Sequence, residues 1–290
     1  MNNVFAMSTM KSSHFFTAYA LESFFKCTKL DDGDEFLLID NDGNDMEKFS
    51  VYEKISIIKN NNPLSFAENV NQGISAAKKG KKNLIFLNND IIFTRNWFQP
   101  LAPISKSISI PACNQLFQYE SDCQKLKIKH TMKLEDFNEN YGLLNDIVLK
   151  HKKKFKPQQQ FQTPLMAFYC FKIPFEILNE IEYFDNTFGK CGGEDIDYRI
   201  RCAIKGYVVN FVLDSYLLHF HGKSTWDGHE SMDQIEKRNA IYTEAFLKKW
   251  GKEMTQIFIL RKDFLNILEN KNLIDLFKKG KFGDLIRKLL

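Results

Sequence analysis

The first ninety residues alternate short apolar runs with stretches of helical spacing. Four apolar runs have the length of buried strands: 4–7, 35–39, 55–58 and 84–87. Between them, residues 14–27 and 66–77 repeat apolar side chains at helical intervals. Strands that alternate with helices favour a mostly parallel, Rossmann-like central sheet flanked by helices. We therefore predict an α/β fold for this part of the chain.

The composition limits the classes of protein to which the chain can belong. Of its 290 residues 44% are hydrophobic, which excludes a disordered chain and allows one large domain. Forty basic residues against 36 acidic ones leave a net charge of +4, a weaker basic bias than nucleic-acid-binding proteins show. We therefore expect no nucleic-acid partner. The six cysteines form no Cys-x-x-Cys pair, and in a chain of this size they indicate reduced thiols in a cytoplasmic protein.

The second half of the sequence is less regular. Residues 120–161 are rich in Lys and Gln, and the basic run 150–154 is interpreted as a solvated helix face or loop, with contact to an anionic lipid or acceptor as the alternative. The elements predicted beyond it are two helices, two extended segments and a helical end: 175–181, 195–204, 207–212, 216–221 and 231–290. We divide the chain into two halves of one domain, 1–105 and 106–230, and a helical C-terminal extension, 231–290.

Polar side chains follow three of the predicted strands, where α/β sheets bind ligands. They are Ser8 and Thr9, then Asp40 and Asp42, then Asn88, Asn89 and Asp90. In the last group, oxygen ligands at positions i and i+2 can face one Mg²⁺ or Mn²⁺ ion while a diphosphate supplies further oxygens. The carboxylate of Asp40 can accept hydrogen bonds from a ribose or a base. Simple polar turns are the alternative at each place.

Two later segments carry groups of the same kind. In residues 192–197, two glycines precede Glu194 and Asp195 at the start of a predicted helix, where the helix dipole favours ionised carboxylates. Such a carboxylate facing a cleft can act as a general base, and helix capping is the alternative. Farther on, His219 and His221 share one face of an extended segment. Either can coordinate the same metal ion as Asp90, and a structural hydrogen bond is the alternative.

Two stretches of the sequence, taken together, resemble family 2 glycosyltransferases. Residues 65–98 carry a helix with Asn and Gly, a strand, an Asp-x-Asp-like motif that reads Asn-Asn-Asp, and an aromatic segment. Residues 184–225 carry Phe-Asp-x-x-Phe, Gly-Glu-Asp-x-Asp, an Arg-bearing helix, Gly-Tyr, and a late His before Ser. The Asn-Asn-Asp form is similar to the rhamnosyltransferase-like branch. The resemblance covers about residues 3–105 and 163–228, and the usual Gly-Gly before Phe-Asp is replaced by Glu182 and Tyr183.

The resemblance implies a GT-A fold and inverting transfer of a sugar from a nucleoside diphosphate donor. Residues 1–105 would hold the donor, and residues 106–230 the acceptor and the catalytic groups. It implies a Mn²⁺ or Mg²⁺ ion held by Asp90, with help from Asn88 and one late histidine, His219 or His221. Asp195 would act as the base, and Glu194 would position the acceptor or share that role. The remaining implied contacts are Ser8, Thr9, Asp40, Asp42, Asn71, Asn88 and Asn89 for the donor, and Trp97 and Gly193 on the acceptor side.

Several alternatives stay open at this point. Core packing is the alternative role of Trp97. The acceptor is expected to be a glycan or a lipid-linked saccharide, and a module that binds a nucleotide sugar without transferring it is the alternative function. A nucleotidyltransferase is the least favoured, because residues 1–30 contain no glycine for a phosphate loop. No run reaches the roughly 18 apolar residues of a membrane span. The amphipathic segment 261–290 is expected to pack on the domain or to lie on an anionic membrane, at its inner face.

Overall fold

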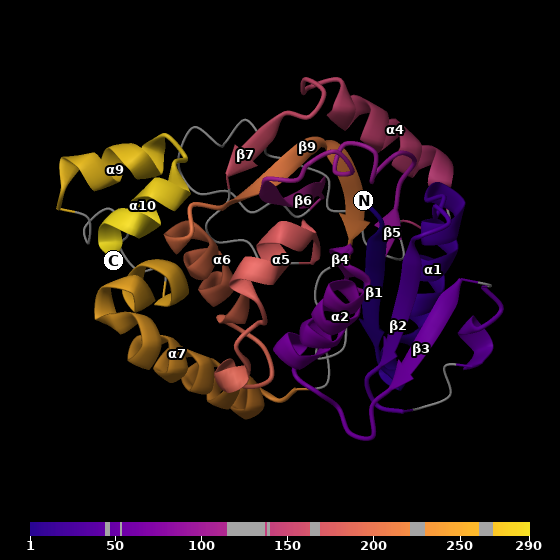
Figure 1. Ribbon diagram of the computed structural model, residues 1–290, viewed down its shortest axis with the longest axis horizontal. Helices are drawn as coiled ribbons and strands as arrows, with labels where there is room; N and C mark the ends of the chain where they lie inside the picture. Colours follow the sequence, from indigo (N-terminus) through magenta and orange to yellow (C-terminus); the bar gives the residue numbers. More distant parts are fainter. Residues whose placement is uncertain are drawn as a thin grey trace.

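A sheet of nine strands runs through the computed structural model (Figure 1). The strand order is β3-β2-β1-β4-β8-β6-β9-β5, and β7 pairs with β9 beside this path. The structure describes residues 1–43, 47–52, 54–114, 137, 140–162, 169–220, 230–260 and 269–290. Strands β3, β2, β1 and β4 are parallel to one another, and the ladder continues through the antiparallel strand β8. The sheet therefore joins the two halves that we divided at residue 105.

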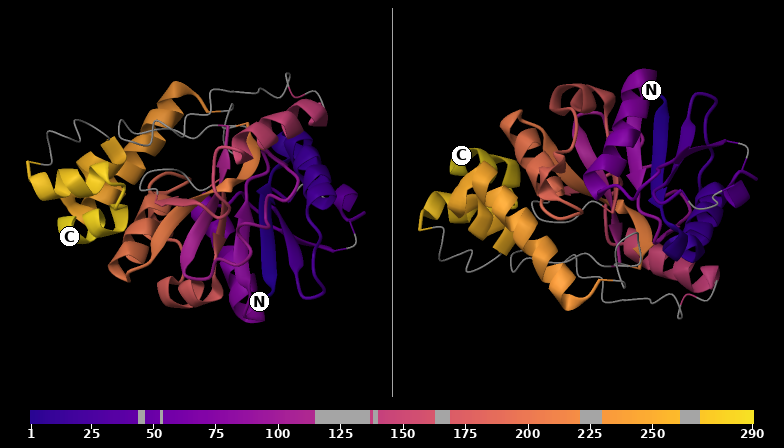
Figure 2. Two further views of the ribbon diagram at one scale, coloured as in Figure 1. Left: turned by 90° about the horizontal axis from the view of Figure 1, so that it is seen from above. Right: turned by 90° about the horizontal axis from the view of Figure 1, so that it is seen from below.

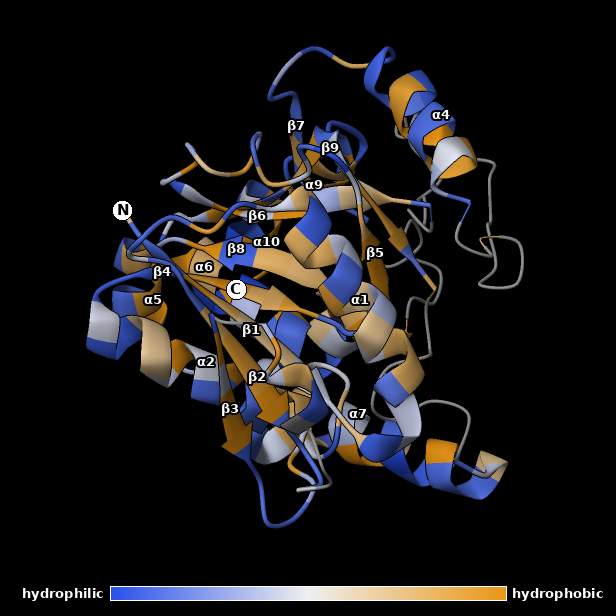
Figure 3. Cartoon of the chain, turned by 90° about the vertical axis from the view of Figure 1, so that its right-hand side faces the viewer, coloured by the Kyte–Doolittle hydropathy of each residue, from blue (hydrophilic) through white to orange (hydrophobic). Residues whose placement is uncertain are grey.

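The described residues of the first half contain five strands, two helices and two short 3₁₀ turns. They are β1 (Asn3–Thr9), a turn at Lys11–Ser13, α1 (His14–Cys27), β2 (Glu35–Asp40), a turn at Glu47–Phe49, β3 (Ile55–Lys59), α2 (Phe66–Gly80), β4 (Asn83–Leu87) and β5 (Ile91–Phe93). Each of the four predicted strands and both predicted helices of this half is present. Strands β1, β2 and β4 are buried almost throughout, which favours the continuous apolar runs by which they were recognised. Figure 3 colours the chain by hydropathy.

The described residues of the second half and the extension contain four strands, six helices, one 3₁₀ turn and one π-helical turn. They are β6 (Ser107–Cys113), α4 (Tyr141–Lys152), β7 (Gln160–Gln162), β8 (Cys170–Ile173), α5 (Phe175–Ile181), the 3₁₀ turn at Asn186–Phe188, α6 (Glu194–Ile204), β9 (Val208–His219), α7 (Met232–Thr255), the π-helical turn at Gln256–Leu260, α9 (Lys271–Lys278) and α10 (Phe282–Leu289). The helices predicted at 175–181 and 195–204 are confirmed.

Two expectations for this half need correction. The extended segments predicted at 207–212 and 216–221 fall on one strand, β9, which runs through residues 213–215 and only shifts its register against β6 there. Residue 221 lies outside the described residues. The described parts of the region 105–160, residues 105–114, 137 and 140–160, are more regular than the sequence suggested. They contain β6, which begins Ser-Ile-Ser-Ile and is buried along its whole length. They also contain the helix α4, which carries both polar and apolar residues along its length (Figure 3).

Helices α1 and α2 fix the sheet from its two faces. Helix α1 connects β1 to β2, and α2 connects β3 back to β4, so their crossovers run in opposite directions along the strand order. Right-handed crossovers then place the two helices on opposite faces. Ser65 caps α2 by accepting a hydrogen bond from the backbone of Glu68, whose carboxylate accepts one from the Ser65 backbone in return.

The C-terminal helices pack on the domain, at the end of the molecule opposite α1 and β3 (Figures 1 and 2). Phe282, Leu285 and Ile286 of α10 are buried in one apolar cluster with Ile200 and Ala203 of α6. Arg287 donates a hydrogen bond from Nη1 to the Ala203 carbonyl oxygen, 2.9 Å away. The apolar face of α10 is therefore covered by protein, as the packing alternative expected. Among the described residues, no helix is long and apolar enough to cross a membrane.

A buried lysine joins the sheet to the loop that follows β5. Lys172 of β8 is 2% exposed, and its Nζ donates to the carbonyl oxygens of Leu101, Ala102 and Ile104 at 2.9, 2.7 and 2.8 Å. Burial lowers the pKa of Lys172 to about 8. The three hydrogen bonds that Lys172 donates compensate for the loss of hydration. They also satisfy the carbonyl oxygens of Ala102 and Ile104, while the Leu101 carbonyl oxygen additionally accepts the backbone N–H of Ile104.

We expect Lys172→Met to destabilise the protein by about 2–4 kcal/mol, because it leaves buried carbonyl oxygens without donors. The free energy of unfolding in urea measures the loss. Lys205→Met is the matched control, since Lys205 makes an exposed ion pair with Glu180 that should contribute at most about 1 kcal/mol. Equal losses in the two variants would contradict the role given to Lys172.

Candidate active site

The polar turn after β4 is held against the start of α1. Asn89 is fully buried, and its Nδ2 donates to Ser13 Oγ at 2.8 Å and to Thr17 Oγ1 at 3.0 Å. Thr9, at the end of β1, hydrogen-bonds to Thr17 and lies 3.4 Å from the same amide. This cluster fixes the ends of β1 and β4 side by side. Asn89 and Thr9 thus position the backbone. A contact of either residue with a nucleotide-sugar donor remains a prediction.

The carboxylates after β2 lie at the same edge of the sheet. Asp40 pairs in register with Thr9 and is fully buried, and neighbouring Ser8 is 7% exposed. The carboxylate of Asp42 accepts the backbone N–H of Lys11 at 3.0 Å, which ties the turn after β2 to the turn after β1. Parallel strands end together here, so Ser8, Asp40 and Asp42 are brought to one edge, as the sequence predicted.

Asp90 and His219 form a buried pair next to that edge. The register between β5 and β9 sets His219 opposite Ile91, and the Nε2 atom of His219 lies 3.3 Å from Oδ1 of Asp90. The ring of Tyr169 stacks on His219 with centroids 4.8 Å apart, and the side chain of Asn114 accepts the His219 backbone N–H. Burial alone would lower the pKa of His219, but the charge and hydrogen bond of Asp90 raise it to about 10.

This pair fits a partial metal site. A carboxylate oxygen and an imidazole nitrogen are suitable ligands for Mn²⁺, and the histidine must lose its proton to bind. Among the described residues, no group of three His, Cys, Asp or Glu side chains could hold an ion, so further ligands have to come from elsewhere. Asn88 is half-buried and donates its backbone N–H to the Tyr169 carbonyl oxygen at 2.8 Å. His221, the other predicted ligand, lies outside the described residues.

The glycine loop before α6 admits close packing from α7. Gly192 has φ +116°, and a Cβ atom there would collide with the ring of Tyr242. Gly193 has φ +85°, forms the N-cap of α6, and would place a Cβ atom 3.1 Å from Phe188. These positions favour glycine because left-handed backbone and lack of space both disfavour a side chain. The loop delivers Glu194 and Asp195 to the first turn of α6.

The two acidic residues of this turn have different surroundings. Asp195 Oδ1 accepts the backbone N–H of Ile196 at 2.8 Å, and its Oδ2 lies 3.7 Å from Nη2 of the buried Arg199, one turn along the helix. Glu194 is 4% exposed, and burial together with the negative charge of Asp195 raises the pKa of its carboxyl well above the ordinary value. Asp195 has a cationic partner suited to an ionised base, whereas Glu194 favours the protonated form.

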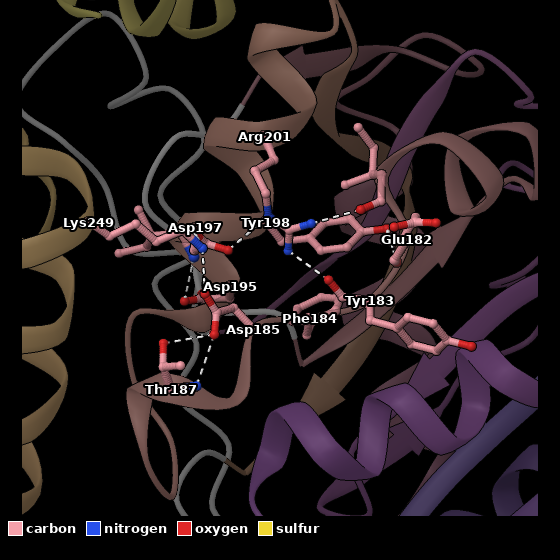
Figure 4. Close-up of polar contacts among 12 residues, drawn as sticks. Glu182, Tyr183, Phe184, Asp185, Thr187, Asp195, Asp197, Tyr198, Arg201 and Lys249 are labelled. Atoms are coloured by element: carbon pink, nitrogen blue, oxygen red, sulfur yellow. Dashed lines mark hydrogen bonds and ion pairs between the residues drawn. The ribbon is translucent and has the colours of Figure 1, made fainter.

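The third acid of the motif joins α6 to α7 (Figure 4). Asp197 is fully buried, and its Oδ1 accepts from Lys249 Nζ at 2.7 Å and from Trp250 Nε1 at 2.9 Å. Its Oδ2 accepts from Arg201 Nε at 2.9 Å. Lys249 also contacts Asp185 at 2.5 Å. Burial would raise the pKa of Asp185, but hydrogen bonds from Lys249 and Thr187 lower it to about 2.

Sequence reasoning did not find the partners of Asp197. The acid itself stands in the motif, but Lys249 and Trp250 follow more than fifty residues later in a helix with no distinguishing pattern. The only sequence signal was the i, i+4 spacing of Asp197 and Arg201 within one helix. The contact between α6 and α7 therefore had to come from the structure.

Two predicted contacts are engaged within the protein. Trp97 is fully buried among Phe24, Phe93 and Phe98, and its indole N–H donates to Thr28 at 2.7 Å. The expectation that it faces an acceptor is therefore wrong, because a ring with no exposed surface packs in the core instead. Asn71 exchanges two hydrogen bonds with the backbone of Phe184, at 2.9 and 2.8 Å. It joins α2 to the Phe-Asp segment, and its role toward a donor stays a prediction.

Comparison with known proteins identifies the fold. No family model matches the sequence, and no curated relative matches it. The solved structure of GalNAc-T7 with UDP, GalNAc and Mn²⁺ is similar with a TM-score of 0.62 at 15% identity, covering 97% of this chain and 54% of that one. TarS of S. aureus, residues 1–349, is similar with a TM-score of 0.53 at 10% identity, covering 96% of this chain and 74% of that one.

These likenesses show the fold alone. The chain has the GT-A glycosyltransferase fold that its motifs predicted, with a mixed sheet flanked by helices. It spans about half the length of GalNAc-T7. Membership of family 2 and of its rhamnosyltransferase-like branch stays a prediction, because identities of 15% and 10% carry no family assignment.

We expect Glu194 to contribute stability that is lost as the pH rises from about 5 to about 8, and Glu194→Gln to remove that part of the pH dependence. A carboxyl whose pKa is raised in the folded state, here from 4.5 to about 8, stabilises the protein below its unfolded pKa and loses this contribution as the pH rises through the folded value. Urea unfolding at the two pH values should show a difference of about 1–3 kcal/mol between the proteins. Glu244→Gln, an exposed change on α7, is the control, and parallel pH profiles for wild type and Glu194→Gln would contradict the expectation.

Proposed function

We propose that this chain is an inverting, metal-dependent glycosyltransferase. It moves a sugar from a nucleoside diphosphate donor to a hydroxyl of a glycan or a lipid-linked saccharide. One observation carries the proposal: within a GT-A fold, the Asp90–His219 pair and the polar ends of β1 and β2 are brought together, while Asp195 stands at the start of α6 with a cationic partner. A protein that binds a nucleotide sugar without transferring it would not require Asp195 and its cationic partner at the start of α6.

The donor would lie along the carboxyl edge of the parallel strands. Asp40 is at the end of β2, where its carboxylate can accept hydrogen bonds from the nucleoside, and Ser8 and Asp42 flank it. Asp90 and His219 would hold a Mn²⁺ or Mg²⁺ ion together with the diphosphate, with Asn88 nearby. When bound, such an ion neutralises negative charge on the leaving diphosphate. GalNAc-T7, solved with UDP and Mn²⁺, supports this assignment.

Asp195 would act on the acceptor. Its carboxylate accepts the proton of the attacking hydroxyl as that oxygen bonds to the anomeric carbon and the diphosphate leaves from the opposite face. Proton removal accompanies the attack, since a sugar hydroxyl is a weak acid. Arg199 places a positive charge 3.7 Å from Oδ2 of this carboxylate. Glu194, with its raised pKa, is suited to hold an acceptor hydroxyl in place.

A panel of nucleoside diphosphate sugars tests the donor and the metal. With Mn²⁺ present, at least one donor should release nucleoside diphosphate, and a chelator should abolish the release. Asp90→Ala should lower turnover by about 100-fold or more, because it removes the carboxylate that would hold the ion. Turnover that persists in chelator or in this variant would contradict metal dependence, and a panel in which no donor is bound or turned over would contradict the enzyme itself.

The base assignment is tested separately. Asp195→Asn should reduce transfer by about 10²–10⁴-fold while the dissociation constant for the donor stays the same, since the amide keeps the shape but accepts no proton. Asp146→Asn, at an exposed position of α4, is the matched control. Substantial transfer by Asp195→Asn would place the base elsewhere, and an unchanged donor affinity with no transfer in any protein would favour a binding module.

A further inference from the structure

Helix α4 packs on the sheet with one face only. Its buried residues, Leu144, Val148 and His151, are spaced by four and three positions, so they form one stripe along the helix. Leu144 and Val148 belong to an apolar cluster with residues of β5 and β9, and the ring centroid of His151 lies 4.7 Å from that of Tyr216. The opposite face of α4 is therefore on the surface of the molecule (Figures 1 and 3).

Large apolar side chains are exposed on this outer face. Leu143 is 44% exposed and Leu149 is 57% exposed. Phe15, in the first turn of α1, is 57% exposed as well. A series of ring contacts joins Phe15 to the first turn of α4 through Tyr19, Phe137 and Tyr141. The exposed apolar groups of the two helices therefore belong to one side of the molecule.

Basic side chains accompany the two leucines. Four exposed lysines lie at the end of α4 and directly after it: Lys150, Lys153, Lys154 and Lys156. Within the part of the chain that the structure describes, none of the four makes an ion pair. Carboxylates are fewer here. Asp146 is the only acid in the sequence of α4, and Oδ2 of Asp214 accepts the backbone N–H of Gln158 at 2.9 Å. The end of α4 therefore carries an excess of positive charge.

This combination fits the surface of an anionic membrane. Lysines at the end of a helix also complement its dipole, but that effect does not reach Lys156 and does not involve the leucines. A nucleic acid offers phosphates to the lysines but no apolar layer to the leucines. A bilayer offers both, because its phosphate headgroups lie next to the acyl chains. Clusters of roughly four to eight basic residues on an amphipathic helix are typical of segments that bind anionic lipids.

We propose that the α4 face, formed by Leu143, Leu149, Lys150, Lys153, Lys154 and Lys156, docks on the surface of a membrane that contains anionic lipids. The ammonium groups would bind the lipid phosphates, and the two leucines would enter the headgroup layer. Phe15 would add apolar contact at the margin. The amphipathic segment at the C-terminus is not required, because α10 buries its apolar face against α6.

The α4 face adjoins the candidate active site. Phe220 directly follows His219, and its ring centroid lies 6.1 Å from that of Phe16 in α1 and 6.4 Å from that of Phe137. Phe137 in turn contacts Tyr141 at the start of α4. Docking would therefore bring His219 and its carboxylate partner close to the lipid headgroups. Within the proposed function, on which this step rests, that position favours the lipid-linked saccharide over a free glycan as the acceptor.

Co-sedimentation with lipid vesicles tests the docking surface. The full chain should sediment with vesicles of phosphatidylcholine and phosphatidylglycerol and not with vesicles of phosphatidylcholine alone, because only the former carry a net negative charge. Raising the salt from about 20 to about 200 mM should weaken the binding, since salt screens exposed charges. Equal binding to both kinds of vesicle, or binding to neither, would overturn the proposal.

Matched variants locate the contact. Replacing the four lysines of the α4 face with Gln should weaken vesicle binding by about 20-fold or more. The control should weaken it less than about threefold, because it loses the same charge from the C-terminal helices, away from α4. It carries four changes at exposed lysines: Lys248→Gln, Lys252→Gln, Lys278→Gln and Lys288→Gln. Equal losses in the two quadruple variants would contradict the role of the α4 face.

The leucines distinguish a membrane from a nucleic acid. Leu143→Gln with Leu149→Gln should weaken vesicle binding by about tenfold, while the free energy of unfolding changes little because both side chains are exposed. Ile204→Gln with Leu247→Gln, at exposed positions of α6 and α7, should leave vesicle binding unchanged. A duplex oligonucleotide that binds more tightly than the vesicles, with a loss in the lysine variant and none in the leucine variant, would replace the membrane by a nucleic acid.

Vesicle binding and donor turnover separate this proposal from the proposed function. A chain that binds anionic vesicles through the α4 face but turns over no donor would support the docking surface and contradict the transferase. Donor turnover without vesicle binding would overturn the docking surface alone.

Discussion

The arrangement of the C-terminal half depends on one buried carboxylate. Asp197 accepts hydrogen bonds from Arg201 within its own helix and from Lys249 and Trp250 of α7, so its negative charge is compensated in the interior. The same contacts set the position of α7 against α6. The helix that begins with the acidic turn is therefore linked to α7 through a side chain that takes no part in the proposed reaction. Removing it would leave Lys249 beside Asp185 alone.

The two halves of the proposed site are built in different ways. Asp40 ends β2, and Asp42 and Asp90 follow β2 and β4, so the parallel order of β2, β1 and β4 places the three acids at one edge. Glu194 and Asp195 instead depend on glycines that let Tyr242 and Phe188 approach the backbone. His219 connects the halves, because β9 belongs to the second half of the chain but pairs with β5 beside Asp90.

Sequence reasoning identified the strand-helix alternation of the first half because buried parallel strands are continuously apolar and their ends are polar. It also identified the acidic turn of α6 and its candidate base. It did not find β6 or α4, and it divided β9, because Asp214 and Ser215 interrupt an apolar strand at the place where its register shifts. Trp97 was assigned to a ligand because its ring is suited to sugars as well as to a core. The contacts of Lys249, Trp250 and Lys172 join segments far apart in sequence, and no local pattern predicts such pairs.

The position of β9 in the chain also has a consequence for folding. This strand pairs with β5, β6 and β7, so each of its ladders joins residues 208–219 to segments that were synthesised much earlier. The parallel strands β1 to β4 need only the first ninety residues and can assemble among themselves. Contacts between distant segments form slowly because a long loop must close first. During refolding, strands β1 to β4 should therefore acquire protection from hydrogen exchange before His219 reaches Asp90.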